Sequence, residues 1–151
     1  KKEAPAIKTR FVNIMELSAL GLGNADCRVP QHDFGDYFTK DKPVIFNFHG
    51  YPETLKQMLF DIGGDGRFAV HGYIENGSTT TPFDMQIRNG TSRYQLAKEV
   101  FAKMAEKGVI EKSMADELIK KYDQKLADHS EFIKKNGVDP EEIENWQWHG
   151  K

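Results

Sequence analysis

The chain has 151 residues, with 21 Lys and Arg against 23 Asp and Glu and a formal net charge of −2. This length fits one domain with its own core, the balanced charge excludes a strongly basic nucleic-acid or anionic-membrane binder, and no apolar run is long enough to span a bilayer. Cys27 is the only cysteine, which excludes an internal disulfide and favours a cytoplasmic location.

The first third of the chain predicts strands on either side of a short helix. Residues 8–15, with the apolar run FVNI, predict a first strand, and the Gly- and Asn-rich residues 21–30 predict a loop. Asp33 is placed to cap a short helix over residues 34–38. The compact, β-branched run at residues 44–48 (VIFNF) then predicts a buried central strand.

The middle of the chain predicts one helix and two further strands. Pro52 suits the first position of a helix, and the apolar residues after it keep the spacing of one helix face (Leu55, Met58, Leu59 and Ile62). Residues 68–74 predict a third strand. Residues 83–87 (FDMQI) alternate apolar and polar side chains, which is typical of a half-buried strand, and residues 75–82 would join the last two strands as a hairpin.

The remainder of the chain predicts helices. Apolar residues at helical spacing over residues 96–104 indicate an amphipathic helix that ends at Gly108. Ser113 resembles the N-terminal cap of a long helix that ends at Gly137. A last short helix opens at Asp139 and carries two docking residues, Ile143 and Trp146.

Together these elements predict a three-layer α/β domain with a mixed, mostly parallel sheet. Alternating strands and helices favour parallel pairing, and the hairpin would add an antiparallel strand. We expect residues 1–151 to form a single domain, with a helical tail from about residue 91.

The end of the second predicted strand holds the main candidate site. His49 and Tyr51 lie between this strand and the next helix, and open α/β sheets bind ligands at the carboxyl ends of their strands. Imidazole, hydroxyl and carboxylate groups together permit general acid–base chemistry. The same groups more often satisfy backbone atoms or subunit contacts, so a structural or interface role is favoured. The further candidates from other strand ends are His71, Thr80, Thr81 and Asp84.

Searches for cofactor and metal motifs return only weak matches. Residues 64–66 (GDG) match the start of a thiamine-diphosphate signature but lack its asparagine pair, so they are interpreted as a helix end. No phosphate-binding loop occurs, and the histidines lack metal-ligand spacing, with His129 interpreted as a surface residue. Cys27 is interpreted as inert, and the sequons at 76–78 and 89–91 as turns. We assign no catalytic, cofactor-binding or metal-binding residue.

Two blocks of the chain resemble the C-terminal domain of phosphoketolases. They are residues 38–52 (FTKDKPVIFNFHGYP) and His71-Gly72-Tyr73 followed by residues 77–85 (GSTTTPFDM). Weaker similarity occurs at residues 10–13 (RFVN) and at Asn89, Arg93 and Leu96. The two blocks occur in the right order, which makes the resemblance specific.

This resemblance implies an architecture and a reaction. Phosphoketolases are similar to transketolases, with two thiamine-diphosphate-binding domains before a C-terminal α/β domain. They use thiamine diphosphate and Mg²⁺ at a homodimer interface to split xylulose 5-phosphate, and often fructose 6-phosphate, with inorganic phosphate. Acetyl phosphate and an aldose phosphate are released. The family's catalytic histidines belong to the upstream domains, so no catalytic residue carries over to this chain.

One departure and one feature of the start bear on the interpretation. Many members have Trp and then basic residues after the position of Pro52, whereas Glu53 follows here, which puts a role of this helix in substrate access in doubt. The chain opens at Lys1 without methionine, as expected for a domain taken from the end of a larger chain.

Three hypotheses follow from the sequence. The first is an inactive fragment of a phosphoketolase that contacts its upstream domains and supports a homodimer. The second is a regulatory module that binds small anions. The third is an independent hydrolase that uses His49 and Asp84.

Overall fold

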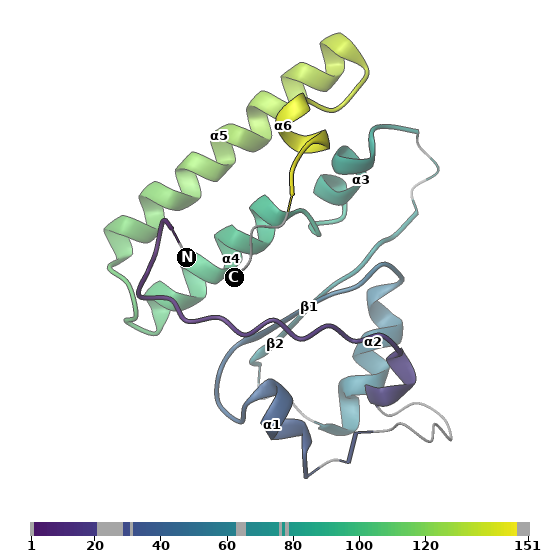
Figure 1. The fold of residues 1–151 in the computed structure, drawn as a ribbon, viewed down its shortest axis with the longest axis vertical. Coiled ribbons are helices and arrows are strands. Elements are labelled where there is room, and N and C mark those ends of the chain that lie inside the picture. The colour runs from purple at the N-terminus through teal and green to yellow at the C-terminus, as the bar shows by residue number, and fades with distance from the viewer. Residues whose placement is uncertain are drawn as a thin grey trace. The chain divides into compact units, whose positions relative to one another are not determined.

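The computed structural model describes residues 2–20, 29–30, 32–62, 66–75, 77 and 79–147. The chain divides into two compact units (Figure 1). Lys8–Ile74 form one, which we call the strand unit. Lys1–Ile7 and Glu75–Lys151 form the other, which we call the helical unit.

The strand unit is built on two parallel strands, β1 (Val44–Asn47) and β2 (Phe68–His71). Val44 pairs with Phe68, and the register continues to Asn47 opposite His71. Parallel strands need a crossover, and here it contains the helix α2 (Pro52–Leu59) and the 3-10 turn η2 (Phe60–Ile62). Two short elements precede β1, namely η1 (Leu17–Leu20) and α1 (Phe34–Phe38).

One apolar core holds the strand unit together. Its buried members come from every helix and turn before η2 and from β1 (Leu20, Phe34, Phe38, Phe46, Leu55 and Leu59). Alternate strand residues, including Val44 and Val70, pack against this core. Arg67 lies 4.3 Å from the centre of the Phe68 ring and donates to the carbonyls of Phe38, Thr39 and Lys42 at 3.0–3.1 Å. The loop between α1 and β1 is therefore held by one arginine.

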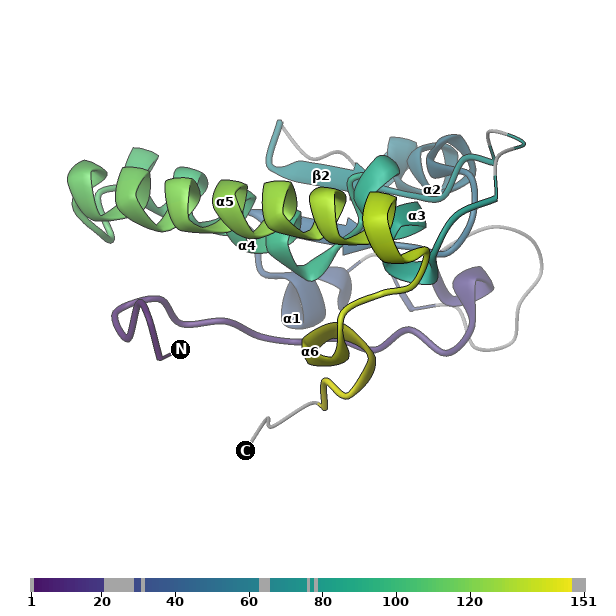
Figure 2. The same cartoon turned by 90° about the horizontal axis from the view of Figure 1, so that it is seen from above.

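The helical unit contains α3 (Pro82–Arg88), α4 (Arg93–Glu106), α5 (Lys112–Asn136) and α6 (Glu141–Glu144). In Figure 2, α4 and α5 run side by side. Gly108 and Gly137 follow α4 and α5 with φ of 67° and 72°, a conformation that glycine adopts at little cost. The core of this unit includes residues from before the strand unit as well as from α4, α5 and the connection between these helices (Ala4, Ile7, Phe101, Ile110 and Ala115).

The α/β class is confirmed, together with the second and third predicted strands and the helices after Asp33, Pro52 and residue 91. The ends of the two long helices are also confirmed, although α5 begins at Lys112 rather than at a Ser113 cap. Trp146 is 48% exposed, and the Arg93 guanidinium lies 4.8 Å from its ring centre. None of the helices in the described ranges is long and apolar enough to cross a bilayer.

Two predicted strands are wrong. Residues 8–15 form an extended segment that is not part of the sheet. Residues 83–87 lie within α3, because Thr81 caps this helix, Pro82 occupies its first turn, and Phe83 and Asp84 are both buried although they are neighbours. The predicted hairpin at 75–82 is therefore also wrong, and the two strands found in the described residues run parallel, not in a mixed sheet.

Candidate functional site

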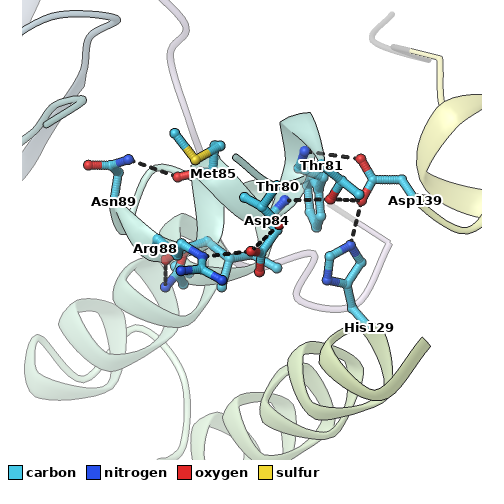
Figure 3. Close-up of polar contacts among 11 residues, drawn as sticks. Thr80, Thr81, Asp84, Met85, Arg88, Asn89, His129 and Asp139 are labelled. Atoms are coloured by element: carbon cyan, nitrogen blue, oxygen red, sulfur yellow. Dashed lines mark hydrogen bonds and ion pairs between the residues drawn. The ribbon is translucent and has the colours of Figure 1, made fainter. Parts of the chain in front are cut away.

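A buried carboxylate, Asp139, joins α3 to α5 in the helical unit (Figure 3). Its Oδ1 accepts from the Thr81 hydroxyl at 2.7 Å and lies 2.7 Å from Nε2 of His129. Its Oδ2 accepts from the Phe83 amide at 3.1 Å. Thr81 also accepts from the Asp84 amide at 3.3 Å, as the N-terminal cap of α3. One carboxylate thus satisfies donors from two helices and one cap.

Hydrogen bonding decides the charge of this carboxylate. Burial by itself would raise the pKa of Asp139, but the hydrogen bonds from Thr81, His129 and the Phe83 amide outweigh it and hold that pKa below its ordinary value. Asp139 is therefore ionised at neutral pH. An ionised carboxylate only accepts hydrogen bonds, so the proton of the 2.7 Å contact lies on Nε2 of His129.

His129 is buried, with 3% of its surface exposed, so the interpretation of it as a surface residue is wrong. Its ring meets the Phe83 ring edge-on with centroids 5.2 Å apart. Its second nitrogen, Nδ1, is buried and has no hydrogen-bond partner among the residues that the structure describes. The histidine is therefore held by one hydrogen bond, from Nε2 to Asp139, and by its contact with the Phe83 ring.

A second polar group sits one turn along α3. Oδ2 of Asp84 accepts from the Thr80 hydroxyl at 2.8 Å and from Nε of Arg88 at 2.6 Å. Asp84 is buried and Arg88 half exposed, so this pair reaches from the interior to the surface of α3. Figure 3 shows Asp84 and Arg88 along α3, Thr80 just before it, and His129 reaching Asp139 from a separate helix.

The hydroxyl and carboxylate groups of the helical unit's polar cluster hydrogen-bond to one another and to the start of α3. Thr80, Thr81 and Asp84 each bond to a neighbour or to a helix terminus rather than pointing at an open space. Buried hydrogen-bonded networks of this kind fix the relative position of helices. Their geometry supports a structural role.

The other three candidates lie in the strand unit. Two hydrogen bonds extend the parallel ladder past the strands, from the Phe48 amide to His71 at 3.0 Å and from the Tyr73 amide to Gly50 at 2.8 Å. His49 stacks on the Tyr73 ring, with centroids 5.0 Å apart and planes 26° apart. Strand alternation puts Asn47 and His49 on one face of this pair, where Asn47 is opposite His71.

We call His49, His71 and Tyr73 the polar edge of the strand pair. Tyr51 follows this polar edge along the chain. It is the N-terminal cap residue of α2, makes no side-chain cap bond, and is 57% exposed. The sequence thus correctly placed His49, Tyr51 and His71 near the carboxyl ends of two neighbouring strands. Thr80, Thr81 and Asp84 belong to the other unit, at the start of a helix instead of a strand end.

Sequence reasoning missed His129 and Asp139. His129 continues the apolar row of α5 at spacings of three and four from Leu126 and Ile133, a signal that was available. Asp139 gives no such signal, because its main partner Thr81 lies 58 residues away.

Across the described parts of the chain, no group of three or more His, Cys, Asp or Glu side chains is placed to hold a metal ion. The interpretations of Cys27, of Gly64 and Asp65 and of the sequon at Asn76 lie outside the described residues. The turn at Asn89 is confirmed, because Gly90 follows α3 with a φ of 69°.

Comparison with known proteins gives a consistent result over nearly the whole chain. A family model described as the XFP C-terminal domain matches residues 1–148. "Probable phosphoketolase 1" of Lactiplantibacillus plantarum is 39% identical over 147 residues, which cover 97% of this chain. "Xylulose-5-phosphate phosphoketolase" of Lactiplantibacillus pentosus is also 39% identical over 147 residues, and "Probable phosphoketolase" of Clostridium acetobutylicum is 36% identical over 146.

The shared region is only a small part of those relatives. The chain spans 18% of the length of each of the three. More than four-fifths of each relative therefore lies outside the region that this chain matches.

Proposed function

Because this chain belongs to the XFP C-terminal domain family, we propose that it is the structural and dimer-supporting C-terminal domain of a thiamine-diphosphate-dependent phosphoketolase. The observation that carries the proposal is similarity to phosphoketolases over 97% of this chain but only 18% of theirs. A region that is preserved throughout, yet is a minor part of the enzyme, fits a domain that acts with the rest of the chain.

The proposed reaction of the full-length protein is cleavage of xylulose 5-phosphate, and of fructose 6-phosphate, with inorganic phosphate. It yields acetyl phosphate and an aldose phosphate. Thiamine diphosphate supplies the carbanion chemistry of such a cleavage when bound. The chain matches only 18% of each phosphoketolase, which supports placing the cofactor and Mg²⁺ in upstream domains. We further propose a cytoplasmic homodimer.

Acetyl phosphate formation tests this proposal. The full-length enzyme and the 151-residue chain are each incubated with thiamine diphosphate, Mg²⁺, phosphate and either sugar phosphate. We expect acetyl phosphate from the full-length enzyme and none above background from the 151-residue chain. A full-length enzyme that consumes neither sugar phosphate, or a short chain that turns over alone, would refute the proposal.

A second candidate function is binding of a small anion in the strand unit. The observation that favours it is the polar edge formed by the stacked His49 and Tyr73 with His71 beside them, next to the N-terminus of α2. Calorimetric titration with phosphate, a nucleotide and an organic acid is expected to show saturable heat with at least one of them. That heat should disappear in His49→Ala, and no heat at millimolar ligand would end this candidate.

A further inference from the structure

The extended segment before η1 has apolar side chains on both of its faces. Val12 and Ile14 pack against the core of the strand unit. Phe11 and Met15 point the other way and are 79% and 88% exposed. Burial alternates strictly from residue 11 to residue 15, which is the periodicity of an extended strand. We call Phe11 and Met15 the outer row.

The two-sided pattern is typical of a segment that is covered on both sides. Single exposed apolar residues are common on protein surfaces and need no explanation. Here two large ones lie on the same side of one segment, about 13 Å apart at the rise of an extended chain. Asn13 lies between them, and its amide donates to Sδ of Met15 at 3.2 Å, which helps to hold the methionine in place.

The comparison with relatives indicates what covers the outer row. The family model describes a C-terminal domain, and more than four-fifths of each relative lies outside the matched region. A chain of that length has ample surface for an interface with this domain, and large apolar side chains are the usual anchors of such interfaces. We propose that the outer row is a docking surface for the upstream part of the same phosphoketolase chain.

This inference rests on the proposed function, because it takes its occupant from the enzyme to which the domain is assigned. It adds the surface through which the domain attaches. Phe11 and Met15 insert into the upstream part of the chain, while Val12 and Ile14 remain in the domain's own core. The extended segment is then buried on both faces, as its sequence pattern indicates.

Thiol accessibility tests the docking surface. Met15→Cys is introduced in a Cys27→Ser background, both in the full-length enzyme and in the 151-residue chain, and alkylation at position 15 is followed by peptide mass spectrometry. Because Met15 is 88% exposed, the substitution leaves the core of the domain intact. Gln57→Cys, an exposed position on α2, is the matched control.

We expect position 15 to be alkylated about tenfold more slowly in the full-length enzyme than in the short chain, and position 57 at equal rates. Equal rapid labelling of position 15 in both would overturn the docking surface. Equal protection in both would also overturn it, because the cover would then be this chain itself or a second copy. Acetyl phosphate formation by the same full-length preparation separates the two proposals, since an active enzyme with a freely labelled position 15 refutes the docking surface alone.

Discussion

Replacing Asp139 with asparagine is expected to lower the free energy of unfolding of the helical unit by about 3 kcal/mol. The carboxylate accepts three hydrogen bonds in a buried position, from Thr81, His129 and the Phe83 amide. An asparagine side chain has one acceptor atom instead of two, so its NH₂ group meets a donor on one side. A buried donor without an acceptor costs about 1–3 kcal/mol.

Urea unfolding followed by far-ultraviolet circular dichroism measures this loss, since α3 to α6 dominate the helical signal. Asp128→Asn is the matched control, because Asp128 lies on the exposed side of α5, where its carboxylate accepts from the Gln124 side chain at 2.7 Å. We expect the control to stay within about 0.5 kcal/mol of the parent chain. Equal unfolding midpoints for Asp139→Asn and Asp128→Asn would contradict the role of the buried carboxylate.

The loss of unfolding free energy in Asp139→Asn, measured against the parent chain, is expected to depend on pH. The pKa of Asp139 is lower in the folded chain than its ordinary value, so its ionised form stabilises the fold. That contribution is complete above the ordinary carboxyl pKa of about 3.9 and is lost as the pH falls through the lower folded pKa. The difference between the parent chain and Asp139→Asn is therefore expected to be constant above about pH 5 and to narrow below about pH 4. If the difference in free energy of unfolding between the parent chain and Asp139→Asn grew as the pH fell, the lowered pKa of Asp139 would be contradicted.

Gly72→Ala is expected to disrupt the end of the parallel strand pair. A methyl group at this position would lie 2.4 Å from the carbonyl oxygen of Gly50 and 2.7 Å from Pro52. Both contacts include backbone atoms, so the strands must move apart, and the bond from the Tyr73 amide to Gly50 at 2.8 Å is lost. We expect a destabilisation of more than about 2 kcal/mol, seen as amide exchange at least tenfold faster in β1 and β2.

Gly35→Ala provides a control with the same change in the same unit. A methyl group there meets only the side chain of Lys40, at 3.1 Å from its Cγ, and a lysine side chain can move away. Gly35 lies in α1, where alanine is favoured over glycine by about 0.5–1 kcal/mol. Exchange in the strands should therefore be unchanged or slower. If both variants accelerated exchange equally, the close approach of Gly72 to Gly50 would not be the cause.

Elements with redundant local signals could be predicted from the sequence. α2 combines a proline in its first turn with apolar residues on one face, and α5 ends at Gly137 in the left-handed conformation that glycine favours. β1 and β2 are compact β-branched or aromatic runs. In each case the local pattern and the packing agree, so the prediction did not depend on distant residues.

The wrong strand at residues 83–87 has a definite physical cause. Phe83, Met85 and Ile87 alternate as in a strand, but Phe83 and Ile87 are also four apart, as on one face of a helix. The pattern alone cannot separate the two periods over so short a run. Thr81 and Pro82, a cap followed by a first-turn proline, decide in favour of the helix.

The candidate site was predicted in part. Local order along the chain was enough to place His49 and Tyr51 after β1 and His71 at the end of β2. The hydrogen bond between Thr81 and Asp139 joins residues 58 positions apart, and a single sequence carries no record of such a contact.

The path of the chain through its two units has a consequence for folding. Residues 2–7 belong to the helical unit, where Ala4 and Ile7 are buried and Glu3 pairs with Lys121 at 2.8 Å, 118 residues further on. Lys8–Ile74 lie between these partners and form the strand unit.

During synthesis from the N-terminus, the strand unit can fold once Ile74 has emerged, because its strand pair and its apolar core precede that point. The helical unit can fold only after α5 has been synthesised, and Ala4 and Ile7 can pack into its core only then. Contacts of such long sequence separation form slowly. Residues 2–7 are therefore synthesised before the strand unit but reach their native position after it.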